Sequence, residues 1–138
     1  MKLEGIHSAC APEPVGLYPH ARRAGDFLFL SGVGPRERGK KEIPGVELDG
    51  NGKILSYNIE TQCHSVFNNV KMILEEAGSS WNNLMDVTVF LTNMADDFVT
   101  YNQIYADYFK ENQPCRTTLG IDSLPTPIAI ELKCIATI

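Results

Sequence analysis

The chain has 138 residues, 43% of them hydrophobic and 21% charged, which suits one globular domain with a sizeable core, and we expect a single domain over residues 1–138. Its net charge of −5 argues against a nucleic-acid partner, which would require a basic face. The N-terminus lacks an apolar signal-peptide core, and no apolar run approaches the roughly 18 residues that cross a bilayer. We therefore expect a cytoplasmic protein without a membrane partner.

The first part of the chain is typical of strands and turns. Residues 1–25 are rich in Pro, Ala and Gly and contain short extended stretches. The apolar run at residues 26–31 predicts a buried strand that ends at Gly32. Residues 34–55 are polar and turn-rich, and Asp49-Gly50-Asn51-Gly52 predicts the tip of a hairpin or loop.

An amphipathic helix is expected over residues 56–77, where apolar side chains recur every three or four positions. Ser56 or Asn58 would cap its start, and Gly78 stands where the end of a helix favours a left-handed residue. The elements expected after it are a strand at 85–91, a helix capped by Asp96 or Asp97 that ends near Asn112, and strands at 116–121 and 128–138. This order indicates an α+β fold, a mixed sheet with helices packed on it. Another subunit would cover the remaining sheet face or edges.

Cysteine and histidine positions do not favour a metal site or a disulfide. No Cys-x-x-Cys pair is present among the four cysteines, and the three histidines are far apart in the sequence. We expect free thiols, mainly as small core residues. Gly32-Val33-Gly34 is followed by Pro35 rather than by a helix start, so it is not a dinucleotide fingerprint, and no cofactor is expected.

Two charges interrupt the last two expected strands. Alternation places Arg116 and Thr118 on one face of their strand and Leu119 and Ile121 on the other. We expect the face with Leu119 and Ile121 to point toward the core. Glu131 lies on the mixed face of the final strand. An Arg in such a place can grip a carboxylate with two hydrogen bonds, and a part-buried Glu can act as a general acid or base. Solvated charges are the alternative for both residues.

The N-terminal part offers two further groups. If the chain is extended there, Tyr18, His20 and Arg22 share a face and could bind an anion and donate protons, or they belong to a basic surface loop. Ser31 and Gly32 close the buried strand, where a ligand could accept a main-chain N–H, or they form a simple turn.

Together these segments resemble the Rid family of reactive intermediate (enamine/imine) deaminases, also called the YjgF family. The matching segments are Gly16-Leu-Tyr18, Leu30-Ser31-Gly32, Thr88-Val-Phe90, Tyr101-Asn102, and Pro114-Cys115-Arg116 followed by Glu131. The resemblance implies a mixed sheet with two helices on one face, as in chorismate mutase trimers. It also implies a homotrimer with a cofactor-free site in each intersubunit cleft.

Carried onto this chain, the family pattern assigns carboxylate binding to Arg116 and the handling of water to Glu131. Tyr18, Gly32 and Asn102 would line the cleft.

This chain departs from the typical family pattern at two places. Thr118 replaces the usual Cys, and the loop between Gly34 and Ser56 is longer. That loop and the Tyr-Pro-His-Ala-Arg-Arg stretch resemble the 2-aminomuconate deaminase branch. A substrate with two carboxylates needs two cationic groups, Arg116 and either Arg22 or His20.

The leading hypothesis is hydrolytic deamination of 2-aminomuconate to its 2-oxo acid and ammonia, with His20 as proton donor. One alternative is a broad deaminase of 2-aminoacrylate or 2-iminobutanoate. The other is a small-metabolite-binding regulatory protein without catalysis.

Overall fold

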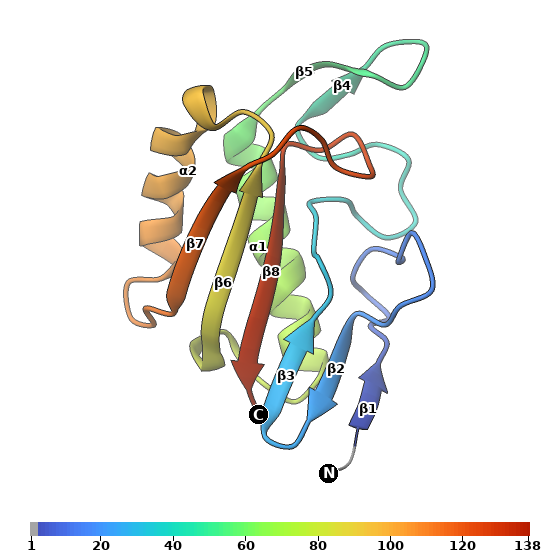
Figure 1. Ribbon diagram of the computed structural model, residues 1–138. Coiled ribbons are helices and arrows are strands. Elements are labelled where there is room, and N and C mark those ends of the chain that lie inside the picture. Colours follow the sequence, from blue (N-terminus) through green and yellow to red (C-terminus); the bar gives the residue numbers. More distant parts are fainter. Residues whose placement is uncertain (1–2) are drawn as a thin grey trace.

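The computed structural model describes residues 3–138 as one six-stranded mixed sheet, a separate two-stranded hairpin and two helices (Figure 1). The elements are β1 (Leu3–Ile6), β2 (Ala21–Ala24), β3 (Phe27–Leu30), β4 (Val46–Leu48), β5 (Ile54–Tyr57), α1 (Ile59–Glu76), a short 3₁₀ turn η1 (Trp81–Asn83), β6 (Leu84–Leu91), α2 (Met94–Tyr108), β7 (Cys115–Gly120) and β8 (Ile130–Thr137). The predicted α+β architecture is confirmed. Neither helix is long and apolar enough to cross a membrane within the described residues.

The large sheet has the strand order β1-β2-β3-β8-β6-β7. All neighbouring strands are antiparallel except β6 and β7, which are parallel. A parallel pair needs a long crossover, and α2 supplies it by packing back onto the sheet. This leaves β7, with Arg116, as an edge strand beside α2 (Figure 1).

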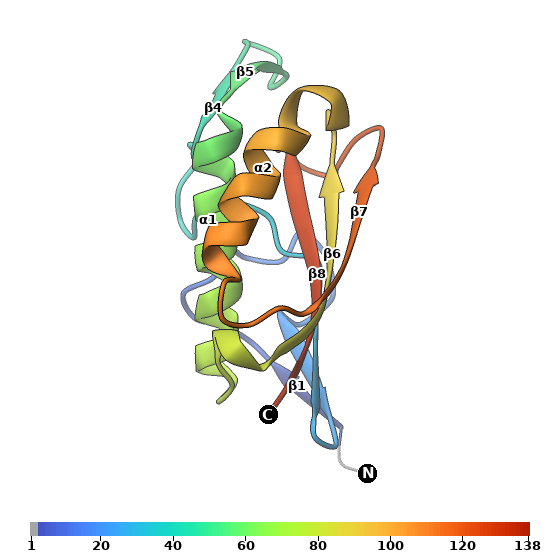
Figure 2. The ribbon, with the colours of Figure 1, turned by 90° about the vertical axis from the view of Figure 1, so that its left-hand side faces the viewer.

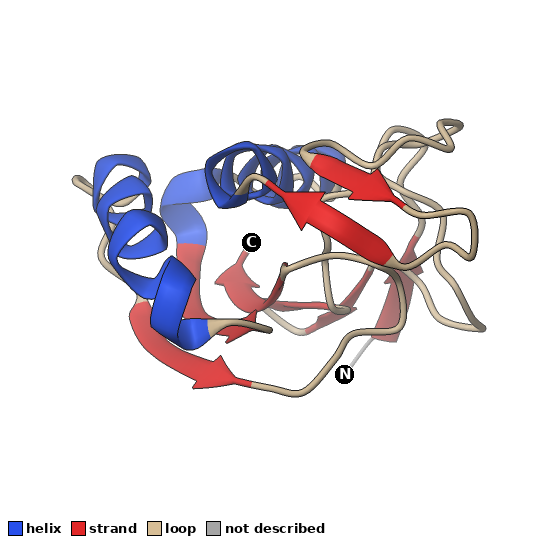
Figure 3. Ribbon diagram, turned by 90° about the horizontal axis from the view of Figure 1, so that it is seen from above, coloured by secondary structure: helices blue, strands red, loops and turns tan. Residues whose placement is uncertain are grey.

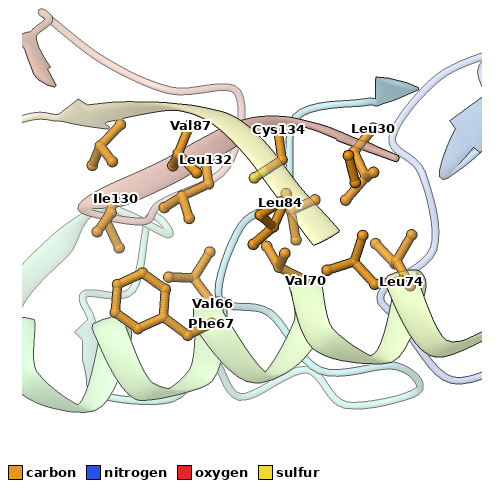
Figure 4. Close-up of a cluster of buried hydrophobic side chains, with 14 of the residues drawn as sticks. Leu30, Val66, Phe67, Val70, Leu74, Leu84, Val87, Ile130, Leu132 and Cys134 are labelled. Atoms are coloured by element: carbon orange, nitrogen blue, oxygen red, sulfur yellow. The ribbon is translucent and has the colours of Figure 1, made fainter. Parts of the chain in front are cut away.

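Both helices lie on the same face of the sheet, and the opposite face has no cover within the described chain (Figure 2). The apolar stripe of α1 packs against alternate residues of the central strands (Figure 4). Residues drawn in this cluster include Leu30, Val66, Phe67, Val70, Leu74, Leu84, Val87, Ile130, Leu132 and Cys134. Burying such a stripe is the main source of stability for a helix of this kind.

The uncovered face of the sheet, called the open face below, carries several apolar side chains. Phe27 is 48% exposed, Phe29 42% and Leu119 44%. The expectation that Leu119 faces the core is therefore wrong. The register of the parallel pair aligns Arg116 with Val87 and so turns Arg116, rather than Leu119, toward the helices.

The ends of α1 are confirmed, whereas α2 begins earlier than expected. Asn58 caps α1 by accepting a hydrogen bond from the Thr61 N–H at 3.0 Å, and Gly78 follows its end with φ +84°. The cap of α2 is Asn93, which accepts from the Asp96 N–H at 3.2 Å, and the helix ends at Tyr108. The prediction of Asp96 or Asp97 as cap is wrong because Asn93 already supplies a side-chain oxygen at that position.

The turn-rich segment before α1 contains the hairpin β4–β5, which lies at the end of the molecule that faces the viewer in Figure 3. Its tip is the predicted turn, since the Gly52 N–H donates to the Asp49 carbonyl at 3.1 Å. The Asp49 side chain also accepts from the N–H groups of Asn51 and Lys53. The second part of the long segment is therefore an ordered hairpin.

Candidate functional site

Glu131 lies on β8 and points to the open face, in register with Phe90 of β6. The isolated bridge between Val33 and Leu132 brings Gly32 directly beside it. A Cβ atom on Gly32 would lie 2.9 Å from Oε1 of Glu131, closer than side chains tolerate. Gly32 therefore leaves room for the carboxylate, which would have to move if this residue carried a side chain.

The Glu131 carboxylate is half-buried and has no ion-pair partner among residues 3–138. Burial raises its pKa above the usual value for Glu because it removes the charged form from water. A carboxylate whose pKa is moved toward neutrality can both accept and return a proton, as a general base that acts on water must do.

Arg116 lies at the other side of the sheet and is held by α2. Its Nη1 donates to Oδ1 of Asn102 at 2.8 Å. Its guanidinium carbon lies 4.7 Å from the ring centroid of Tyr105 and 5.5 Å from that of Tyr101. Thr118, two residues along β7, shares a 2.7 Å hydrogen bond with the Tyr101 hydroxyl. The cation is thus oriented by an amide and two aromatic rings, while the side chain stays exposed.

Within one chain, Arg116 and Glu131 do not form one site. Arg116 is on the helix side of the sheet and Glu131 on the open face, with β6 between their strands. Val87 of β6 pairs with both Arg116 and Cys134. Glu131 is three residues from Cys134, or about 10 Å along the strand. One small substrate cannot contact both side chains of the same chain.

His20 is buried and both of its ring nitrogens are occupied. Nδ1 accepts from the Ser8 N–H at 2.9 Å, so Nε2 carries the proton and donates it to the Pro12 carbonyl at 2.7 Å. The ring therefore fixes the N-terminal segment against the sheet. The hypothesis that His20 is the proton donor has no support in this arrangement, since no nitrogen is free for a substrate.

Tyr18, Ser31 and Gly32, which were predicted to line the site, do lie together around a small pocket that His20 also lines. The Tyr18 hydroxyl accepts from the Val15 N–H at 3.1 Å. The Ser31 hydroxyl donates to the Pro19 carbonyl at 2.7 Å. Both hydroxyls thus help to shape the chain next to Gly32 and Glu131.

Arg22 is separate from this pocket. It is exposed on β2 opposite Phe29, which pairs with Ile135 of β8. Ile135 is four residues from Glu131, or about 13 Å along the strand. The predicted shared face of Tyr18, His20 and Arg22 does not bring Arg22 to Glu131.

The sequence analysis did not identify the contact of Tyr101 and Tyr105 with Arg116. Their spacing around Asn102 is the signal that could have found it, because positions i and i+4 of a helix share a face. The hydroxyl of Tyr105 is buried without a hydrogen-bond partner in the described part of the chain. Among residues 3–138, no three His, Cys, Asp or Glu side chains form a cluster that could hold a metal ion.

Comparison with known proteins places the chain in a family. The chain belongs to the Endoribonuclease L-PSP family, the YjgF/Rid/RutC family, whose model matches residues 8–138. It is 38% identical over 133 residues to a RutC family protein of Pyrococcus horikoshii, covering 96% of each chain. It is 35% identical over 138 residues to the chloroplastic Reactive Intermediate Deaminase A of Arabidopsis thaliana, covering all of this chain and 67% of that protein.

The fold is that of solved members of the family. The crystal structure of E. coli TdcF with bound serine superposes with a TM-score of 0.83 at 28% identity, covering 98% of each chain. The resemblance to the Rid family drawn from the sequence is therefore confirmed.

Proposed function

We propose that this protein is a cofactor-independent hydrolytic deaminase of enamine or imine carboxylic acids. The observation that carries the proposal is the unpartnered, half-buried Glu131 carboxylate, with a raised pKa, against Gly32. The relative named Reactive Intermediate Deaminase A supports the reaction class. The serine bound to TdcF supports a small ligand with a carboxylate. The family description mentions an endoribonuclease, but the net charge of −5 does not favour RNA as substrate.

The complete site would combine two copies of the chain in a homotrimer. One copy would contribute Arg116 from its edge strand, and its neighbour would contribute Glu131 and Gly32. Two features support this arrangement: the two halves are separated within one chain, and the open face carries exposed apolar residues such as Phe27 and Phe29. Covering that face with a second copy would also bury Glu131 further.

In the reaction, Arg116 would bind the substrate carboxylate while the enamine tautomerises to its imine by moving a proton from nitrogen to carbon. Glu131 would take a proton from water as the water oxygen bonds to the imine carbon. The C=N electron pair would become a lone pair on nitrogen. Glu131 would return its proton to that nitrogen, which gives a carbinolamine. Glu131 would then carry the proton of the new hydroxyl group to the nitrogen as the C–N bond breaks, C=O forms and ammonia leaves. The balance is imine plus water giving 2-oxo acid plus ammonia, without an additional proton donor such as His20.

Within this class we propose a dicarboxylate such as 2-aminomuconate as the preferred substrate. A broad deaminase of 2-aminoacrylate and 2-iminobutanoate is the second candidate, and a metabolite-binding protein without turnover is the third. Ammonia release from freshly generated 2-aminomuconate and 2-aminoacrylate separates the three.

Mixing two inactive variants tests the composite site. Arg116→Ala and Glu131→Gln subunits, each nearly inactive alone, are co-expressed and purified as mixed assemblies, with light scattering to check their size. We expect ammonia release to return, because some interfaces then hold both original residues. If the wild type is active and the mixed assemblies are no more active than either variant alone, the composite site is ruled out. A wild type that releases no ammonia from either substrate would rule out the deaminase.

A further inference from the structure

Lys133 lies on β8 two residues beyond Glu131 and on the same, open face of the sheet. Because a strand rises about 3.3 Å per residue, the Cα atoms of these residues are about 7 Å apart. Nζ of Lys133 donates to the Leu30 carbonyl at 2.6 Å, immediately before Ser31 and Gly32. The ammonium group is therefore held at the chain segment that forms one wall of the Glu131 site.

An irregularity between β3 and β8 explains why the Leu30 carbonyl receives this bond. The ladder pairs Phe29 with Ile135 and resumes only at the bridge between Val33 and Leu132. Three residues of one chain segment thus face two of the other, so the regular pattern of hydrogen bonds is interrupted. Lys133 satisfies the carbonyl with one of its three N–H donors, which leaves two for a ligand.

The charge of Lys133 has no acidic partner in the described chain. The ion pairs among residues 3–138 join Arg38 to Glu13, Lys40 to Glu37 and Lys110 to Asp107. Two residues from Lys133, Glu131 is likewise unpaired. An exposed cation fixed by a carbonyl at the edge of a reactive site can receive an anion from a ligand.

We propose that Lys133 determines specificity by binding the distal carboxylate of a dicarboxylate substrate. This inference rests on the proposed function: Arg116 takes the carboxylate beside the imine, Glu131 acts on water, and Lys133 takes the other end. The distance from Glu131 to Lys133 suits a chain of a few carbon atoms. Sequence offered Arg22 or His20 as the second cationic group. Arg22 lies opposite Phe29, which pairs with Ile135, about 13 Å along the strand from Glu131, and the ring nitrogens of His20 are occupied.

The test compares Lys133→Met with wild type on 2-aminomuconate and on 2-aminoacrylate. We expect KM for the dicarboxylate to rise about 10- to 100-fold, as the loss of one charge-assisted hydrogen bond implies, with kcat kept. KM for the monocarboxylate should change less than about twofold, the range of surface substitutions. Lys133→Arg should restore most of the affinity, and the matched control Arg22→Met should show no such selectivity.

Equal losses on both substrates would mean that Lys133 only supports the Leu30 carbonyl, and the inference would fall. It would also fall if Arg22→Met, and not Lys133→Met, weakened the dicarboxylate alone. A binding measurement keeps the inference testable if wild type proves inactive. Calorimetry with adipate and hexanoate, which have the same chain length, should show a preference for adipate that Lys133→Met removes. Equal affinity of wild type for the two acids would overturn the inference.

Discussion

The two halves of the candidate site are built in opposite ways. Around Arg116, the amide of Asn102 and the rings of Tyr101 and Tyr105 orient the cation. Around Glu131, no charged partner is present among residues 3–138, and burial raises the pKa of the carboxyl. A supported cation suits binding, which depends on a fixed geometry. An acid without a charged partner suits proton transfer, because burial raises its pKa and so makes the protonated form easier to reach than in an ordinary Glu.

The substitution that tests this difference between the two halves most strongly is Glu131→Gln. If the residue acts as the base, kcat for ammonia release should fall about 10²- to 10⁴-fold, the range of general acid–base catalysis, with KM nearly unchanged. Glu111→Gln, at an exposed position, is the control and should behave as wild type. If Glu131→Gln instead raised KM by a comparable factor and left kcat unchanged, the role of Glu131 would be in binding.

The pH dependence follows from the same residue. Burial raises the pKa of Glu131, so its basic form is lost at a higher pH than for an ordinary Glu. We expect kcat to rise with pH through this raised pKa and then to level off, and the rise should be absent from the residual activity of Glu131→Gln. A wild-type kcat independent of pH across the acid range would contradict the role of Glu131 as base.

Gly32→Ala should have the next largest effect. The new Cβ would lie 2.9 Å from Oε1 of Glu131 and displace the carboxylate. Since small displacements in a catalytic site are costly, we expect kcat to fall about 10- to 100-fold while the protein stays folded. Gly50→Ala is the matched control because a Cβ there meets no atom within 4 Å. Equal behaviour of the two variants would show that the close approach does not position the base.

A smaller effect is expected at the binding half. Asn102→Ala removes the acceptor at 2.8 Å from Nη1 of Arg116 and leaves the aromatic rings in place. One hydrogen bond of about 1 kcal/mol predicts a rise in KM of about fivefold with kcat kept. The exposed Asn68→Ala on α1 serves as control. A fall in kcat without a change in KM would contradict the division into a binding and a reacting half.

The smallest effect is expected for Glu76→Gln, and it concerns stability. Glu76 accepts hydrogen bonds from the Ser8 hydroxyl and from the Ala9 N–H, and the Ser8 bond lowers the pKa of this carboxyl. The stabilisation is present above the unfolded-state pKa and is lost as pH falls through the lowered folded-state pKa. Denaturant unfolding should show a loss of about 1 kcal/mol at neutral pH, and a smaller loss in acid. Glu75→Gln should change little at either pH.

Much of the architecture could be predicted from local patterns. The helical stripe with Asn58 and Gly78 at its ends, the Asp49–Gly52 turn and the apolar strands depend on neighbours in sequence. The resemblance carried by Arg116 and Glu131 also identified the family. These features are local because periodicity, caps and turn residues act over a few positions.

Only the tertiary structure decided which side of the sheet each charge occupies. Alternation shows that Arg116 and Leu119 are on opposite faces, but the parallel register with β6 turns Arg116 toward α2 and Leu119 outward. His20 is fixed by Ser8 and Pro12, which are brought to it by the folding of the N-terminal segment. Sequence by itself determined the helices, the strands and the chemical groups that they carry, because these depend on residues close together in the chain. Strand pairing over long separations decided which groups meet, and it separates Arg116 from Glu131 within one chain.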